Sequence, residues 1–204
     1  MQGKKIGIIS LMPDTGNTTI AINLGLAFLK LGKKVVVVDA EKNKNIIEHM
    51  SISDIKNVDY PLEYYNLVHN SGLKLVYDFK ENFNLNTLSV FHDLLLIDMP
   101  KNESLEEIIP FIDEAIIIHT PEYSSKAVVD TKNILLKNKK TVLGVILNKS
   151  HEDSVNTIFN VPVLCKIPVH KKISSSYNIK KPLLQVYPNS FVSKKFFNIA
   201  KRFI

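Results

Sequence analysis

The chain has 204 residues, and its 26 Lys and Arg residues against 20 Asp and Glu residues give a formal net charge of +6. The single cysteine, Cys165, excludes an internal disulfide, and every apolar run is far shorter than the ~20 residues that cross a bilayer. The lysines are dispersed and no signal-peptide pattern opens the chain, so we expect a cytoplasmic protein with a solvated basic surface, folded as one domain over residues 1–204.

Short apolar runs rich in Val and Ile alternate with amphipathic stretches along the chain, which is typical of a parallel sheet with crossover helices. Most of these runs are apolar on both faces, so helices should cover both sides of the sheet. This pattern predicts an α/β fold with three layers. The expected strands are residues 5–10, 33–40, 73–79, 92–98, 114–120, 141–148 and 161–167.

The stretches between these runs supply the expected helices, and Gly32 is well placed to end the first of them in a left-handed conformation. For the last helix we favour packing on the sheet over contact with a lipid surface. Tyr60, Tyr64 and Tyr65 are interpreted as packing residues of another helix rather than as a partner-binding patch. The expected helices are residues 17–31, 44–50, 61–70, 103–110, 124–138, 151–158 and 190–203.

The segment between the first strand and the first helix has the position of a phosphate-binding loop. A working loop reads G-x-x-x-x-G-K-[ST]: glycines expose backbone N–H groups, a lysine reaches the β- and γ-phosphate oxygens, and a hydroxyl holds magnesium. The corresponding positions here hold Leu11, Gly16, Asn17 and Thr18. The glycine and the hydroxyl are kept, so the backbone amides from Thr15 to Thr19 could still hold an anion, and Thr18 could ligate Mg²⁺.

The lost part of the motif is electrostatic. Asn17 is a neutral dipole where a cation is needed, Asp14 adds a carboxylate, and Pro13 has no N–H to donate. At an effective dielectric near 20, two like charges about 4 Å apart repel by roughly 4 kcal/mol, whereas one neutral hydrogen bond returns about 1 kcal/mol. We therefore expect the loop to oppose triphosphate binding.

The chain resembles the MinD/ParA family of deviant P-loop ATPases outside residues 42–90. In that family the loop looks like KGGVGKTT, so Met12 and Asn17 occupy the positions of its two lysines, and Pro13 and Asp14 those of two glycines. The resemblance is carried, in the family's order, by GNTTIAINLGLAFLKLGKKVVVVDAE, HDLLLIDMP, EAIIIHTPEYSS, GVILNKS and IPVHKKISSSYNIKKPLLQVYPNSFVSKKF.

The resemblance implies a P-loop NTPase-like, mainly parallel sheet of seven or eight strands. It also implies ATP-dependent dimers in active relatives, which position partners on membranes or DNA. The family's signature lysine contacts the nucleotide of the other subunit, so Met12 removes that contact. A homodimer of this chain should therefore not be switched by nucleotide.

Several family site residues have counterparts here, by resemblance alone. Asp39 and Asp98 correspond to carboxylates near magnesium, although Asp98 reads equally well as a helix cap or loop residue. Glu41 stands where the family's Asp orients the attacking water, so it is the candidate catalytic residue if the protein is active. Asn148 resembles the residue at the adenine edge, and the backbone around Pro168 resembles the loop that lines the base.

These observations favour a protein that binds ATP or ADP with Mg²⁺ weakly or not at all, and whose ATPase activity is weak or absent because both loop lysines are missing. We expect a regulator or spatial-positioning scaffold that acts through an unidentified protein partner, an interpretation that rests on analogy of fold. One alternative is a functional ATPase of the MinD/ParA type, and a second is a basic binder of nucleic acid or membrane surfaces.

Overall fold

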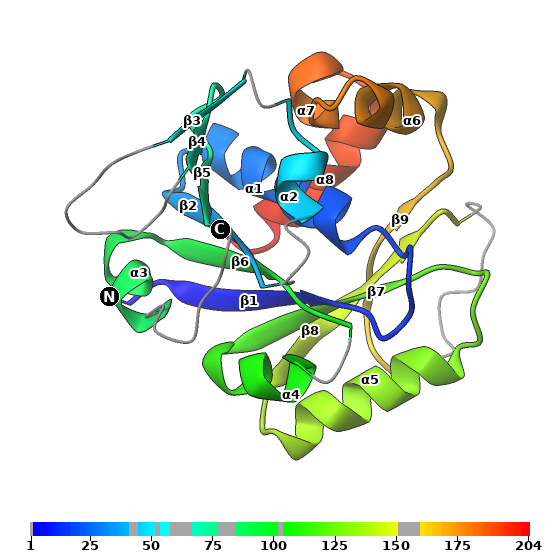
Figure 1. Ribbon diagram of the computed structural model, residues 1–204. Coiled ribbons are helices and arrows are strands. Elements are labelled where there is room, and N and C mark those ends of the chain that lie inside the picture. The colour runs from blue at the N-terminus through cyan, green and yellow to red at the C-terminus, as the bar shows by residue number, and fades with distance from the viewer. Residues whose placement is uncertain are drawn as a thin grey trace.

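The computed structural model describes residues 2–40, 45–51, 54–57, 67–76, 85–101, 104–150 and 160–204, and Figure 1 shows its layered arrangement. Nine strands form one sheet in the order β3-β4-β5-β2-β6-β1-β7-β8-β9, and all neighbours are parallel except those that involve β4. The strands are β1 Lys4–Ile9, β2 Val35–Asp39, β3 Ile55–Asn57, β4 Leu67–His69, β5 Lys74–Val76, β6 Leu94–Asp98, β7 Glu114–His119, β8 Thr141–Asn148 and β9 Val163–Ile167.

Helices cover both faces of this sheet, which confirms the predicted three-layer α/β fold (Figure 1). On one face α1, α2, α7 and α8 enclose a core that includes Phe28 and Phe196, and on the other α3, α4 and α5 enclose Leu95 and Leu135. The helical segments are α1 Asn17–Lys30, α2 Asn45–Glu48, α3 Leu85–Phe91, α4 Ser104–Ile108, the 3₁₀ turn η2 Ile109–Phe111, α5 Lys126–Lys137, α6 Lys171–Asn178, α7 Leu183–Val186 and α8 Phe191–Lys201.

The sheet is larger than the expected seven or eight strands because β3 and β4 extend it with antiparallel pairs. The prediction of a helix over 61–70 is wrong for residues 67–69, which form β4. Gly72, at φ +85, turns the chain back so that β4 pairs with β5. Burial of Leu67 and His69 around the more exposed Val68 has the period of two of a strand.

The strongest helix predictions are confirmed. Gly32 follows α1 at φ +85, and its N–H donates to the Leu29 carbonyl, so it ends the helix as expected. In α8, Phe196 and Ile199 are buried, which confirms packing on the sheet. The expected helix over 151–158 and the three tyrosines at 60, 64 and 65 lie outside the described residues. The helices α3, α6 and α7 were not predicted from the sequence.

The burial of three histidines leads to a prediction of how the free energy of unfolding depends on pH. Burial lowers the pKa of His69, His92 and His119 below the ordinary value of 6.5. The unfolded chain therefore binds more protons than the folded one below about pH 6.5, and the protein should lose stability as the pH falls from 7.5 to 5.5. Each histidine contributes up to about 1.4 kcal/mol per pH unit between its two pKa values.

Urea unfolding across this pH range measures the effect, and His92→Gln should make the pH dependence shallower whatever it does to absolute stability. A free energy of unfolding that stays constant or rises on acidification would contradict the assignment.

Candidate functional site

The loop that follows β1 lies at the carboxyl ends of the central strands, where α/β sheets gather ligands. Two left-handed residues shape it: Asp14 at φ +53 and Gly16 at φ +90. Asp14 is exposed, whereas the neighbouring Thr15 is fully buried. The segment expected to be a phosphate loop therefore forms a turn, which leads into the first turn of α1.

The first turn of α1 has no side-chain cap, because Gly16 occupies the N-cap position. The first N–H groups of a helix have no partner inside the helix, and together with the helix dipole they favour an anion at this end. Thr18 and Thr19 lie in this turn beside Gly16 and line the same pocket. These amides are the part of a phosphate site that the sequence retains.

The three residues predicted at a magnesium site come together behind this turn. The Thr18 hydroxyl donates to Asp98 Oδ2 at 2.5 Å, and Asp98 is the direct sheet partner of Asp39 on β2. Asp39 Oδ2 in turn accepts from the Ile46 N–H at 2.9 Å. Both carboxylates are buried, with 0% exposure for Asp39 and 1% for Asp98.

A hydroxyl and two carboxylates at adjacent strand ends form a donor set that suits magnesium, which takes one or two protein carboxylates and completes its shell with water and phosphate oxygens. The carboxylate of Asp98 thus bonds a side chain of α1. Among the described residues, no group of three or more His, Cys, Asp or Glu side chains could hold a metal ion. A magnesium ion held by Thr18, Asp39 and Asp98 would complete its shell with water or ligand oxygens.

The predicted adenine-edge residue contacts the phosphate loop. Asn148, at the end of β8, donates from Nδ2 to the Thr15 carbonyl at 2.7 Å. It lines the pocket together with Pro168, which follows β9. The sheet thus holds the loop after β1 and the strand ends of β8 and β9 around one cavity.

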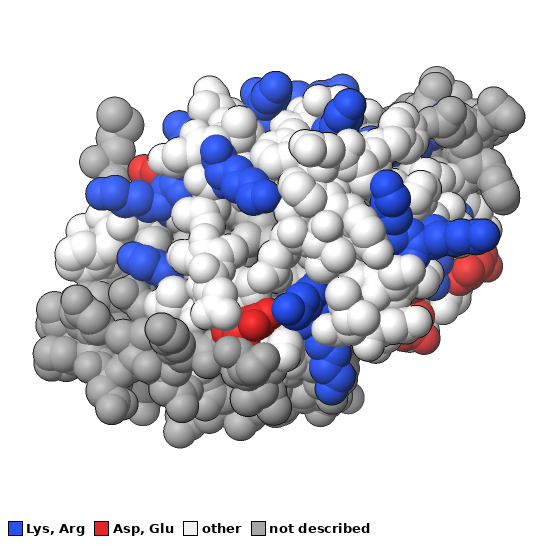
Figure 2. Space-filling model, turned by 90° about the horizontal axis from the view of Figure 1, so that it is seen from above, with Lys and Arg blue, Asp and Glu red and all other residues white. Residues whose placement is uncertain are grey.

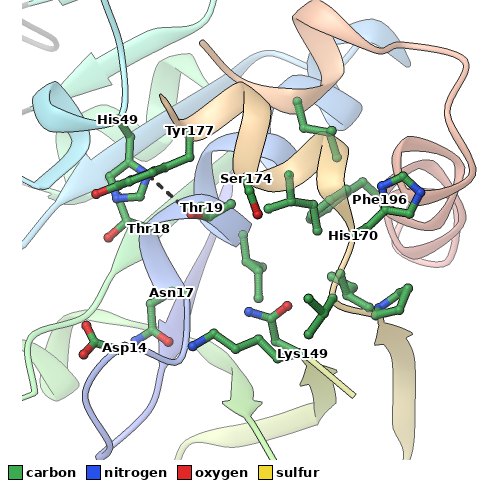
Figure 3. Close-up of a pocket in the computed structure, with 18 of the residues that line it drawn as sticks. Asp14, Asn17, Thr18, Thr19, His49, Lys149, His170, Ser174, Tyr177 and Phe196 are labelled. Carbon is green, nitrogen blue, oxygen red and sulfur yellow. Dashed lines mark hydrogen bonds between the residues drawn. The ribbon is translucent and has the colours of Figure 1, made fainter. Parts of the chain in front are cut away.

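That cavity has a volume of about 510 Å³, within the range of ~300–1,000 Å³ that small-molecule sites occupy. Figure 3 shows its lining side chains, which come from the loop, α1, α6 and the ends of β8 and β9. The predicted binding residues that line the cavity are Gly16, Asn17, Thr18, Thr19, Asn148 and Pro168. Thr15 is not a lining residue, and its carbonyl accepts the hydrogen bond from Asn148. Glu41 lies outside the described residues.

Asn17 has an unusual environment for a polar side chain. It is only 1% exposed, and its Oδ1 accepts a hydrogen bond from the Thr15 hydroxyl at 3.1 Å. Its Nδ2 has no hydrogen-bond partner among the described residues, although it belongs to a pocket-lining side chain. A buried donor without a partner costs about 1–3 kcal/mol, so a ligand oxygen at this point would be stabilised.

Several residues that line the pocket were not predicted from the sequence. His49, just after α2, lies with Nδ1 3.3 Å from the Thr19 hydroxyl, and its ring meets Tyr177 of α6 edge-on at 5.0 Å (Figure 3). Neither residue belongs to a motif, because they meet only after α2 and α6 pack above α1. Lys149 was also missed, although its position beside Asn148 was a usable signal.

Cationic side chains surround the mouth of the pocket. Lys101 and Lys149 are among the lining residues, whereas Asp14 is the only carboxylate among the described residues that line it. Figure 2 shows that, among the described residues, the charged side chains on the face seen from above are mainly Lys and Arg. Such a field raises the local concentration of anionic ligands.

Within the described part of the chain, no helix is long and apolar enough to cross a membrane.

Residues 6–183 match the family model described as the CobQ/CobB/MinD/ParA nucleotide binding domain. The chain is 29% identical to an ATP-binding protein of Methanocaldococcus jannaschii, in an alignment that covers 98% of this chain and 87% of the relative. It is also 25% identical to an iron-sulfur cluster carrier protein of Saccharolobus solfataricus, covering 98% and 82% of the two chains.

Solved structures share the fold. The septum site-determining protein MinD of Pyrococcus horikoshii, complexed with Mg-ADP, superposes with a TM-score of 0.82 at 21% identity, over 98% of this chain and 96% of that one. MinD of Aquifex aeolicus, in its complex with MinC, gives a TM-score of 0.80 at 20% identity over the same shares.

Proposed function

Since the chain belongs to the CobQ/CobB/MinD/ParA nucleotide-binding family, we propose that it binds an adenine nucleotide beside its altered phosphate loop and acts on a protein partner without depending on ATP hydrolysis. One observation carries the binding half of this proposal. The Asn17 side chain is buried at the position of a phosphate-binding lysine and belongs to the residues that line the pocket, and its amide donor has no partner among the described residues. A phosphate oxygen would accept a hydrogen bond from this amide, next to the first backbone N–H groups of α1.

Thr18, Asp39 and Asp98 would hold magnesium beside the phosphates, where the ion would neutralise their charge. The Thr18 to Asp98 hydrogen bond keeps the hydroxyl and the carboxylate in place before any ligand arrives. Asn148, which is bonded to the phosphate loop, and Pro168 would face the base. Thr18, Asn148 and Pro168 line the cavity, and Asp98 is joined to it through Thr18.

The residues of the loop favour nucleotide binding over ATP hydrolysis. No lysine lies between Lys5 and Lys30, so no side chain of the loop can stabilise the charge that develops in phosphoryl transfer. Asp14 lines the pocket and repels a third phosphate group. A nucleoside diphosphate should therefore bind at least as tightly as the triphosphate.

The proposed partner is a protein. A relative with the same fold, MinD of Aquifex aeolicus, was solved together with MinC, so this fold offers surfaces for a partner. Met12 takes the position of the lysine that, in relatives, joins two subunits through nucleotide. We therefore propose a regulator or positioning scaffold whose homodimer, if it forms, does not depend on ATP.

Isothermal titration calorimetry with ATP and with ADP, each with and without Mg²⁺, tests this proposal. We expect dissociation constants of about 0.1 mM or weaker and ADP binding no weaker than ATP, because the site lacks loop lysines and carries Asp14. A magnesium-dependent constant for ATP in the low micromolar range would contradict the weakened site.

The competing function is an active ATPase, and one observation favours it. Thr18, Asp39 and Asp98 keep an arrangement that suits magnesium, which a protein without nucleotide chemistry has no need to preserve. Phosphate release from ATP, followed over hours with Asp98→Asn as a control, separates the two functions. Turnover that the control abolishes would support the ATPase.

A further inference from the structure

Lys149 follows the last residue of β8 and has a left-handed backbone, with φ +52. Its neighbour Asn148 is bonded to the Thr15 carbonyl of the phosphate loop, so the backbone of Lys149 is fixed close to that loop. Among the described residues, Lys149 and Lys101 are the lysines whose side chains line the pocket. Figure 3 shows the Lys149 side chain extending from the end of β8 toward Asn17 and Asp14.

The ammonium group of Lys149 is held only loosely by its own chain. Its Nζ lies 3.8 Å from Glu122 Oε2, beyond hydrogen-bond distance, and the two side chains are 37% and 61% exposed. An exposed ion pair of this kind contributes little, and water screens it. Lys149 can therefore turn from Glu122 to a stronger anion at little cost.

We infer that Lys149 supplies the cation for phosphate groups in this pocket, in place of the two lysines that the loop lacks. The ligand class is a nucleoside phosphate, and the inference rests on the proposed nucleotide binding. Lys149 would reach the phosphates from the strand side, opposite the Asn17 amide and the first turn of α1. Glu122 would then compete with the nucleotide for the same ammonium group.

The test compares four variants by NMR titration with ADP and Mg²⁺: Lys149→Gln, Lys149→Arg, Glu122→Gln and Lys139→Gln. Lys149→Gln should weaken ADP binding about tenfold, since it removes one charge-assisted contact. Glu122→Gln should tighten it about threefold, because Lys149 loses its competitor. Lys139→Gln is the matched control: Lys139 also has a left-handed backbone, with φ +56, but does not line the pocket, so ADP binding should not change.

The outcomes separate this inference from the proposed function. If the parent binds ADP but Lys149→Gln binds it equally well, nucleotide binding stands and the role of Lys149 is wrong. A loss of equal size in Lys149→Gln and Lys139→Gln would point to general charge and would also overturn the role. If the parent binds neither ADP nor ATP, both proposals fail. Retained binding in Lys149→Arg, together with loss in Lys149→Gln, confirms that the charge is what matters.

Discussion

A fourfold loop variant carrying Met12→Lys, Pro13→Gly, Asp14→Gly and Asn17→Lys should bind ATP with magnesium at least about 100-fold more tightly than the parent. Asn17→Lys adds a charge-assisted contact of about 1.5–3 kcal/mol within the subunit, and Met12→Lys adds a second one to the nucleotide of the other subunit. Two such contacts exceed a hundredfold in affinity. Pro13→Gly returns an amide donor to the loop. Asp14→Gly removes a carboxylate from the pocket lining and suits the left-handed backbone at φ +53.

The double variant Met12→Lys with Asn17→Lys is the matched control, because it restores charge without restoring the glycines. We expect it not to hydrolyse ATP, since Asp14 still directs a carboxylate into the pocket and Pro13 still lacks an N–H. Calorimetry and phosphate release measure binding and turnover for both variants. The fourfold variant should recover binding, while its turnover depends also on Glu41, which stands in place of Asp.

Two results would contradict this account. Hydrolysis by the double variant well above the parent would mean that Pro13 and Asp14 do not disable the loop. A fourfold variant that folds and binds no nucleotide would mean that this loop is not a nucleotide site, although the chain keeps the family's fold.

The central strands could be predicted because their residues are apolar on both faces of the strand. Val35 to Val38 are apolar at every position, and such a run is stable only inside a sheet covered on both faces. The segment 67–69 was misassigned because LVH fits a helix and a strand equally well, and the hairpin with β5 decides between them. α6 was missed because KKISSSYN has few apolar residues, and its one fully buried side chain is the small Ser176.

The residues of the site also divide into those that could be predicted from the sequence and those that could not. Thr18, Asp98 and Asn148 belong to motifs with fixed positions at strand ends, so their meeting around the loop followed once the strand order was known. His49 and Tyr177 come from segments whose place in the fold depends on packing, and no local pattern marks them. The contacts of His49 with Thr19 and with Tyr177 could therefore be found only in three dimensions.

The contact between Gly16 and Asn148 leads to the prediction with the next largest effect. A Cβ atom added at Gly16 would lie 2.5 Å from Asn148 Nδ2, the atom that bonds the Thr15 carbonyl. Gly16→Ala must therefore displace the Asn148 amide and also place a side chain at φ +90. The left-handed backbone costs about 1–2 kcal/mol and the lost hydrogen bond about 1 kcal/mol more.

Gly32→Ala isolates the cost of placing a side chain on a left-handed backbone, because Gly32 has a similar φ of +85 and nothing lies within 4 Å of an added Cβ. Gly16→Ala should lower the free energy of unfolding by about 2–3 kcal/mol and weaken ADP binding more than tenfold, whereas Gly32→Ala should cost about 1–2 kcal/mol and leave binding unchanged. In an Asn148→Ala background the clash is absent, so Gly16→Ala should cost no more than Gly32→Ala. Equal effects of Gly16→Ala with and without Asn148 would show that the two residues are not coupled.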